Sequence, residues 1–337
     1  MNHRQKYLSA SLIALAASLS AASVGAWAAT APALNTASGY SVLSVGTAIP
    51  PSTAADATAA VTATTSTVTG DVGSAGAVTL TGSTINGNVV FSGALVNTGS
   101  TMSGTSTPLP VQVINDFNTA YGQYAAIPCT GTLDTAYTGA TLTLTPGVYC
   151  NDAAVTFTDS TLTLDGLGNA NAVWIFKIGT LGTGALTGTN FTVNMANGGD
   201  ACNVSWWVAE ASTMTTSGFQ GSILAGAAIT LTGLAGTATP FNGDIMAKAG
   251  ITMTDVTVTG CTGGGANNGH DGCNGGKDND HGDGDHDNHH EWKHCNQGVG
   301  NGPEGCDPGN SNLHNPYGSN DEHGGTKGKP GRKGGNK

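Results

Sequence analysis

The C-terminal part of the chain concentrates residue types that bind metal ions. Residues 262–337 are rich in Gly, Asn, Asp and His, and several histidines lie among aspartates near Cys295: His270, His281, His286, His289, His290 and His294. Imidazole and carboxylate groups at close spacing can hold Zn²⁺ or Ni²⁺. His286, His289, His290 and His294 are therefore weak candidates for a metal site.

Known metal motifs do not fit this segment. The paired Cys-x₂₋₄-Cys spacing of a zinc finger is absent. A calcium loop beginning at Asp283 would need Gly where Asn288 stands and Glu where His294 stands. With few apolar residues, 262–337 cannot form a core. We expect a disordered, low-complexity tail that is dispensable for binding, with no metal and no cofactor.

Carboxylates that could perform acid–base chemistry are few. Asp152, Asp159 and Asp165 form the nearest cluster in residues 29–261, and the only cations of that segment are Lys177 and Lys248. A β-helical enzyme acting on polysaccharides needs clustered carboxylates in a groove, often with Arg, Lys or calcium. Asp165 precedes Gly166 in the manner of a turn residue. We therefore expect no enzymatic activity.

The composition excludes further classes of protein. Of the 337 residues only 10% are charged, 52 are Gly, and the net charge is −11. A nucleic-acid-binding protein needs a basic surface, so no nucleic-acid partner is expected. Helix-forming Glu, Lys and Arg are scarce while Gly and Thr abound, which argues against an ordinary helical enzyme.

Residues 29–261 repeat a short phrase in which apolar residues alternate with Thr or a small polar residue. The copies are 78–81, 142–145, 155–158, 162–165, 191–194, 229–232 and 251–254, with a degenerate copy at 212–215. Such alternation predicts short strands with the apolar side inward and Thr outward. Later copies recur after 17 residues (Thr213 to Thr230) and 22 residues (Thr230 to Thr252), which favours a β-solenoid. A β-sandwich is the main alternative, although its strands usually recur every 8–12 residues.

One segment has the periodicity of a helix. Val111, Ile114, Phe117, Tyr121 and Tyr124 step by three or four residues and so share one helical face. Thr107 as N-cap and Pro108 at the first position predict a helix over 108–126. Its apolar face needs a partner, and two near-continuous apolar runs, 172–176 and 204–208, are typical of strands covered on both sides.

The N-terminus has the features of an export signal. Arg4 and Lys6 precede an apolar run from Leu8 to Val24, and a small-x-small cleavage site ends at Ala28. We predict a signal peptide over 1–28 and a secreted protein; a short membrane anchor is the alternative. No second apolar run of spanning length follows.

Export permits disulfides, and the number of cysteines is odd. Cys129, Cys150, Cys202 and Cys261 lie in the middle segment and allow three pairings, while Cys273, Cys295 and Cys306 lie in the tail. We lean towards 129–150 and 202–261, because each pair brackets one run of strands.

Several motifs occur in an order that resembles a known family. They are Leu43…Gly46-Thr47, Thr69-Gly70-Asp71-Val72-Gly73, Leu144-Thr145-Pro146-Gly147-Val148-Tyr149-Cys150, Asn171-Ala172-Val173-Trp174-Ile175-Phe176-Lys177-Ile178-Gly179 and Ala201-Cys202-Asn203-Val204-Ser205-Trp206, with the lone helix between early and later strands. The chain thus resembles the bacterial and fungal ice-binding (antifreeze) proteins of the DUF3494 type over residues 34–260. The resemblance implies an all-β, discontinuous right-handed β-helix of triangular cross-section over 29–261, with one long α-helix packed alongside. It also implies adsorption to ice through one flat face. That face is irregular in the family, so its residues cannot be transferred by a fixed motif.

Elementary physics identifies the best candidates for that face. Ordering water in an ice-like array requires rigid, regularly spaced, weakly polar groups, and Thr has a stiff χ1. Stacked strands repeat every ~4.7–4.9 Å, close to a repeat of the ice lattice. The predicted ice-binding residues are Thr213, Thr215, Thr230, Thr232, Thr252 and Thr254. Thr79/Thr81, Thr143/Thr145 and Thr156/Thr158 either extend this face or belong to another, and Thr is in any case common on exposed strands. Lys248 and Glu210 should lie off the face.

The partner expected from these observations is ice or ordered water, bound by a monomer that does not span a membrane. A secreted β-helical adhesin or surface/matrix-interaction module is the alternative function, because it shares the fold and the export signal. Exposed aromatic residues in a groove would favour sugar binding, whereas a flat Thr/Ala face without a groove would favour ice.

Overall fold

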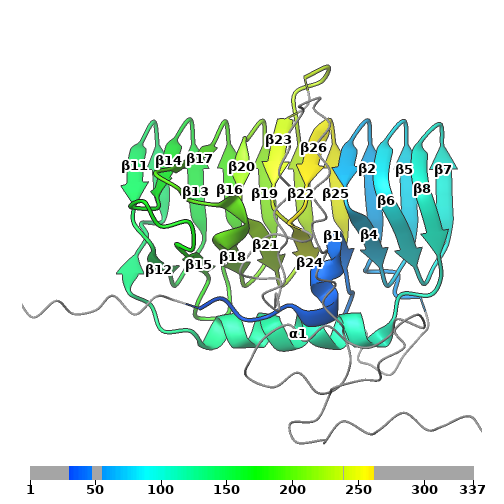
Figure 1. Cartoon of the computed structure of the whole chain (residues 1–337), viewed down its shortest axis with the longest axis horizontal. Helices are drawn as coiled ribbons and strands as arrows, with labels where there is room; N and C mark the ends of the chain where they lie inside the picture. Colours follow the sequence, from blue (N-terminus) through cyan, green and yellow to red (C-terminus); the bar gives the residue numbers. More distant parts are fainter. Residues whose placement is uncertain (1–29, 48–54, 238, 262–337) are drawn as a thin grey trace, which may run out of the picture. The chain divides into compact units, whose positions relative to one another are not determined.

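The computed structural model describes residues 30–47, 55–237 and 239–261. The predicted signal peptide (1–28), the predicted tail (262–337) and its weak metal candidates lie outside the described residues. In the described ranges the chain forms a solenoid of short parallel strands with one α-helix alongside (Figure 1). No helix in those ranges is both long and apolar enough to cross a membrane.

The strands form three faces, of which the first lies against the helix. This helix face comprises β9 (Gly131–Thr132), β12 (Gly147–Asn151), β15 (Trp174–Ile178), β18 (Val204–Val208), β21 (Ser222–Ala225), β24 (Ile245–Ala247), β1 (Tyr40–Ser44), β4 (Asp71–Ser74) and the ends of β6 (Thr84–Phe91) and β8 (Thr101–Ser106). Two 3-10 helices, Asn35–Gly39 and Ala201–Asn203, precede β1 and β18.

The second face, called here the threonine face, is a separate nine-stranded sheet. Its strands in spatial order are β10 (Ala136–Thr138), β13 (Val155–Thr158), β16 (Leu186–Thr189), β19 (Ser212–Thr215), β22 (Ile229–Thr232), β25 (Ile251–Thr254), β2 (Val61–Thr64), β5 (Val78–Thr81) and β7 (Leu95–Thr98).

The third face is interrupted. It comprises the three-stranded sheet β11 (Thr141–Leu144), β14 (Thr161–Asp165) and β17 (Thr192–Ala196), followed by β20 (Phe219–Gln220), β23 (Thr239–Asn242), β26 (Val256–Thr259), β3 (Thr67–Thr69) and the beginnings of β6 and β8. A single bridge between Thr192 and Gly218 joins the two parts.

The solenoid is discontinuous in sequence. β1, β2 and β3, from the N-terminal segment, pair with β24, β25 and β26, from the end of the described chain. The helix connects β8 at one end of the solenoid to β9 at the other, so the later coils run back to meet the first ones (Figure 1). The predicted β-solenoid is thus confirmed, and the β-sandwich is wrong.

Aromatic stacking fills the interior. Phe176 stacks on Trp206 with ring centroids 3.9 Å apart, and Phe157 stacks on Phe191 at 4.2 Å. Phe176 and Trp206 are register partners on β15 and β18 and so meet at the strand spacing, whereas Phe191 packs over Gly188, the residue opposite Phe157. This continuous core keeps the coils in register and therefore keeps the outer faces regular.

The helix α1 (Val111–Ala126) begins three residues later than the sequence predicts. Its N-cap is Pro110, in an extended conformation, and not Thr107. A residue before proline is pushed out of the helical region, so Leu109 cannot be helical, and its side chain is instead buried. The predicted apolar stripe is buried from Ile114 onward, whereas Val111 is only half-buried.

The helix packs where the two apolar runs predict. Trp207 Nε1 donates to the Tyr121 carbonyl at 3.0 Å, and the Tyr121 hydroxyl donates to the Val208 carbonyl at 2.9 Å. Tyr124 is fully buried and its hydroxyl lies 2.9 Å from Ser205 Oγ. Trp174 and Trp206, by contrast, point into the solenoid core.

Both lysines of the described residues contact the helix. Lys177 Nζ donates to the carbonyls of Ala125 (2.8 Å) and Ile127 (2.6 Å), at the helix end whose carbonyls lack intrahelical partners. Its residue is 4% exposed, and burial lowers the pKa of the amine. Lys248 Nζ lies 4.1 Å from the centroid of the Tyr121 ring.

Replacing Lys177 by Met should destabilise the protein by about 2 kcal/mol, because the two helix-end carbonyls lose a charged donor held by a buried side chain. Lys248→Met should cost less, about 0.5–1 kcal/mol, since its cation–π contact is partly solvated. Urea unfolding followed by circular dichroism measures both. Equal losses would show that the helix-end carbonyls find other partners.

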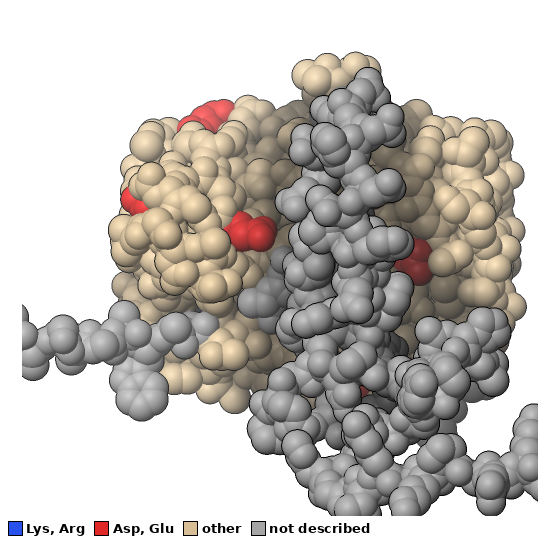
Figure 2. Space-filling view, in the orientation of Figure 1, with Lys and Arg blue, Asp and Glu red and all other residues tan. Residues whose placement is uncertain are grey.

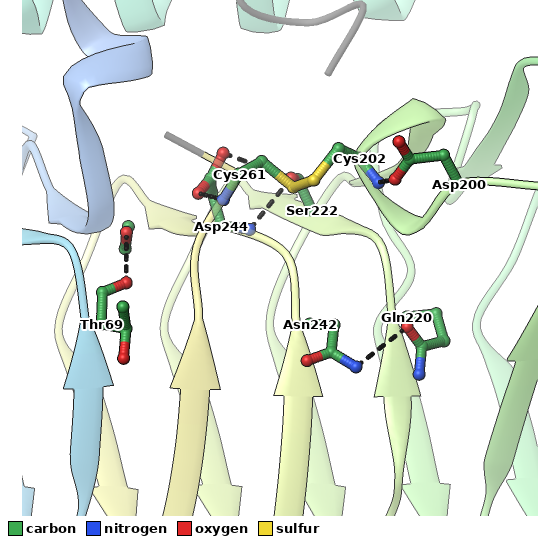
Figure 3. The surroundings of a disulfide bond; sticks show 9 residues. Thr69, Asp200, Cys202, Gln220, Ser222, Asn242, Asp244 and Cys261 are labelled. Carbon is green, nitrogen blue, oxygen red and sulfur yellow. Dashed lines mark hydrogen bonds between the residues drawn. A yellow bond between two sulfur atoms is a disulfide. The ribbon is translucent and has the colours of Figure 1, made fainter. Parts of the chain in front are cut away.

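Two disulfides join coils, and they are the pairs towards which the spacing leaned: Cys129–Cys150 and Cys202–Cys261. Beside the second lies a buried carboxyl group, Asp244, at 0% exposure (Figure 3). The Asp244 carboxylate accepts hydrogen bonds from the Cys261 amide at 2.8 Å and from Ser222 Oγ at 3.5 Å. Burial raises the pKa of Asp244 to about 7, although these bonds act in the opposite direction.

Asp244 should make stability fall as pH rises. In the unfolded chain its pKa is about 3.9, whereas in the folded chain it is about 7. The folded state therefore binds the proton more tightly, and stability is lost as pH rises between those values. Asp244→Asn keeps an acceptor for Cys261 and should flatten the melting temperature between pH 5 and pH 8. Parallel slopes for the variant and the parent would assign the pH dependence to other groups.

Candidate functional site

The outward side chains of the threonine face form two straight columns. Because its strands pair directly, each Thr lies opposite the equivalent Thr of the next coil. The first column contains Thr156, Thr187, Thr213, Thr230, Thr252, Thr62 and Thr79, between Ala136 and Val96 at the ends. The second contains Thr138, Thr158, Thr189, Thr215, Thr232, Thr254, Thr64, Thr81 and Thr98.

All six sequence-predicted residues lie in these columns. Thr213, Thr230 and Thr252 are neighbours in the first column, and Thr215, Thr232 and Thr254 are neighbours in the second. Between them, Met214, Leu231 and Met253 are buried, with at most 2% exposure. The expected strand register is therefore confirmed, and the Thr side chains are half-buried by one another or exposed.

The structure also decides where the other Thr pairs lie. Thr79/Thr81 and Thr156/Thr158 extend the same face. Thr143 lies on β11, in the third face, and Thr145 lies outside the strands. The repeated phrase is thus used by two faces of the solenoid.

Sequence reasoning missed two Thr pairs of the columns, Thr62/Thr64 and Thr187/Thr189. In the second pair the inward residue is Gly188, which interrupts the apolar alternation. A side chain there would collide with Met214, because a Cβ would lie 2.6 Å from its sulfur. A signal that could have found both pairs is the small residue two positions before the first Thr, which is Ala60 in one pair and Ala185 in the other.

A third column of small residues borders the first Thr column. On eight coils the position two residues before the first Thr-column position is Ala or Gly: Ala154, Ala185, Ala211, Ala228, Gly250, Ala60, Ala77 and Ala94. Their carbonyls accept the amides of the next strands, for example Val155 to Ala185 at 3.0 Å and Ile229 to Gly250 at 3.0 Å. None of these side chains projects beyond a methyl group, so the surface continues flat to this edge.

The opposite edge is a row of tight corners. The residue after the second Thr has a positive φ on most coils: Gly139, Asp159, Asn190, Thr216, Asp255, Thr65, Gly82 and Gly99. Non-glycine residues rarely adopt this conformation. Here side chains link neighbouring corners: Asn190 Nδ2 donates to Asp159 at 2.9 Å, Thr216 donates to Asn190, and Thr65 donates to Asp255. These links hold the coils at fixed spacing.

Charge is kept out of the two Thr columns and the small-residue column. Lys248 lies over Tyr121 at the helix, as expected, and Glu210 accepts the Gly184 amide at 2.9 Å within a turn. Asp159 and Asp255 stand at the corner edge and are engaged in the corner links. Figure 2 shows one side of the solenoid; on the part that the grey atoms leave uncovered, acidic side chains are isolated and no Lys or Arg is visible.

The carboxylates considered for catalysis stabilise turns instead. Asp152 bonds to Thr180, Asp159 to Asn190, and Asp165 accepts the Leu167 amide at 2.9 Å. Bonds from Leu167 and Asn197 lower the pKa of Asp165. Among the described residues no group of three His, Cys, Asp or Glu side chains could hold a metal ion.

A shallow depression lies beside the third face. It has a volume of about 480 Å³ and is lined partly by Gln220, Asn242, Thr259 and Asp200. Its single carboxylate, Asp200, caps a 3-10 helix by accepting the Cys202 amide at 2.9 Å. The lining has no aromatic side chain and no pair of acids, so it lacks the parts of a polysaccharide-cleaving site.

Comparison with known proteins decides the family. A family model described as ice-binding-like matches residues 54–260, which include every strand of the threonine face. The chain belongs to this family. A solved ice-binding protein from an Antarctic Flavobacteriaceae bacterium matches with a TM-score of 0.51 and 30% identity, over 68% of this chain and 47% of that one.

Two relatives are similar in sequence. An ice-binding protein of Nostoc sp. (strain HG1) is 39% identical over 129 residues, which are 38% of this chain and 46% of the relative. Ice-binding protein 1 of Shewanella frigidimarina (strain NCIMB 400) is 42% identical over 86 residues, 25% of this chain and 9% of the relative. The matches thus span less than half of each relative.

Proposed function

We propose that this protein binds ice crystal surfaces through the threonine face and so inhibits ice growth and recrystallisation. The observation that carries the proposal is the array itself: two in-register Thr columns beside a small-residue column, without a charged side chain in any of them. Such a surface can order water at fixed positions because Thr side chains are stiff and the strand spacing is constant. Family membership and the names of the relatives support it.

The mechanism is adsorption and requires no catalysis, cofactor or metal. Water ordered by the hydroxyl and methyl groups becomes part of the crystal, and growth stops where the protein is attached. The protein acts as a monomer in this proposal. It is secreted after cleavage near Ala28, a location for which its two disulfides are suited.

The adhesin alternative receives less support from the surface. The exposed large apolar side chains of the described residues are Val96, Leu167, Leu181 and Leu234, and none is aromatic. Sugar-binding sites commonly stack aromatic rings on their ligand. A flat face of Thr and Ala fits ice better.

Freezing-point hysteresis and ice-recrystallisation assays on the full chain test the proposed function. We expect a concentration-dependent gap between melting and freezing temperatures and small, stable crystal grains. A folded protein, verified by its β-type circular dichroism, that shows neither effect would refute ice binding. Retained binding to extracellular polysaccharide in the same preparation would then favour the adhesin.

The small-residue column should be part of the binding surface. Ala228→Tyr places a ring two residues before Thr230, at the edge of the array, and should reduce thermal hysteresis several-fold while the melting temperature changes little. Unchanged hysteresis would restrict the ice-contacting surface to the Thr columns.

A further inference from the structure

We propose that the threonine face selects the primary prism plane of ice, with the solenoid axis lying along an a axis of the crystal. This inference rests on the proposed function and adds which surface of the crystal is bound. It follows from the two-dimensional geometry of the array.

The array is rectangular and free of dislocations. The eight strand pairings of the threonine face contain no register shift, whereas the β1–β4 and β6–β8 pairings, on the other faces, each contain one. Each Thr is directly opposite its neighbour, as Thr213, Thr230 and Thr252 show. One edge of the repeating rectangle is therefore the strand spacing, ~4.7–4.9 Å. The other is a two-residue rise along the strand, ~6.6 Å.

One column alone would not distinguish ice planes. The strand spacing is close to the a-axis repeat of hexagonal ice, and both the basal and the primary prism planes contain an a axis. The second Thr column removes this ambiguity, because it fixes the distance to the next row of bound water.

The second distance favours the prism plane. In the primary prism plane, rows along a are repeated along the c axis, at a distance slightly larger than the two-residue rise. In the basal plane the rectangular repeat is longer still, so the second column fits less well. In the secondary prism plane neither edge is as short as the strand spacing. The primary prism plane is thus the best match to both edges.

The array is also long enough for the fit to matter. The second column holds Thr on all nine strands, and the first holds Thr on the seven central ones. The corner links described above, such as Asn190 to Asp159, limit distortion at one edge. Because each of the seven central coils carries both Thr residues, the spacing that distinguishes the planes is repeated on every one of them.

Growth of a single-crystal ice hemisphere in a solution of the full chain labelled with an amine-reactive dye tests the inference. Neither described lysine is on the threonine face, because Lys177 and Lys248 both contact the helix. We expect fluorescence confined to patches on the primary prism planes. Because basal surfaces stay uncovered, crystals held in the hysteresis gap should also burst along the c axis when growth resumes.

The outcomes distinguish failure of the prism-plane inference from failure of ice binding itself. Fluorescence on the basal, secondary prism or pyramidal planes, or over the whole hemisphere, would overturn the prism-plane inference and leave ice binding intact. Absence of fluorescence together with absence of hysteresis would refute the proposed function.

Two variants assign the pattern to a face. Thr230→Tyr should abolish the prism pattern, whereas Thr67→Tyr, at an outward position of the third face between Thr257 and Thr84, should leave it unchanged. A prism pattern that survives in Thr230→Tyr would overturn the inference, since another surface would then carry the selectivity.

Discussion

Thr230→Tyr should remove most of the thermal hysteresis while leaving the fold intact. Thr230 lies in the middle of the first column, flanked by Thr213 and Thr252. Its side chain is half-buried by these neighbours and faces outward, so a phenol ring there would project above the plane of the hydroxyls. One projection holds the neighbouring groups away from the crystal. The folding free energy should change by less than about 0.5 kcal/mol, as for most surface substitutions.

The measurement is hysteresis against protein concentration, with melting temperature determined on the same samples. Thr67→Tyr is the matched control, because it makes the same substitution at a half-buried Thr of the third face and should preserve hysteresis. Equal hysteresis in Thr230→Tyr and the parent would place the ice-binding surface elsewhere on the solenoid. Unfolding of the variant would mean that the half-buried Thr230 site does not accommodate a ring between Thr213 and Thr252.

The alternation of apolar residues and Thr was sufficient to predict the strands, their inward sides and the stacking of coils. Period-two patterns determine which side chains point inward, and Met214, Leu231 and Met253 follow this rule. Periodicity also predicted the helix, because its apolar residues recur every three or four positions. Its start was misplaced because Pro110, the second proline of the segment, prevents Leu109 from being helical.

The sequence could not show which face each strand joins. Copies of one phrase occur on the threonine face at 155–158 and on the third face at 162–165, and both bury Leu, Val or Phe. What separates them is the corner, where Asp159 adopts a positive φ and turns the chain between the two strands. Thr65 and Thr216 occupy the same conformation, which a β-branched residue rarely adopts. Pattern reasoning alone therefore does not identify these corners.

Local sequence patterns also could not predict the pairing of strands that are far apart in the chain. The Thr columns pass from Thr252 to Thr62, between strands of opposite ends of the described chain. Strand spacing along the sequence cannot predict such a pairing, because the helix interrupts the repeat and carries the chain back to the far end. The array is consequently longer than the six residues chosen from consecutive later coils.

Removing the Cys202–Cys261 disulfide should have the largest effect on stability. The bond closes a loop with a sequence separation of 59, and the chain-entropy model gives a loss of about 4 kcal/mol when it is broken. For a domain of this size that corresponds to a fall in melting temperature on the order of 10 °C. The two cysteines should be replaced together by Ser. A single replacement would leave an unpaired thiol that could exchange with the three cysteines of 262–337.

The Cys129–Cys150 bond provides the comparison. Its sequence separation is 21, so the same model gives a smaller loss, about 3 kcal/mol. Hysteresis near 0 °C should persist in both double variants, because neither bond touches the threonine face and each protein remains folded well below its melting temperature. A larger loss from the shorter loop would show that strain or contacts outweigh loop entropy. Loss of hysteresis with native circular dichroism in the Cys202/Cys261 variant would give that bond a second role. The bond joins the end of the last coil to the 3-10 helix before β18, and it would then also keep the junction between Thr252 and Thr62 in register.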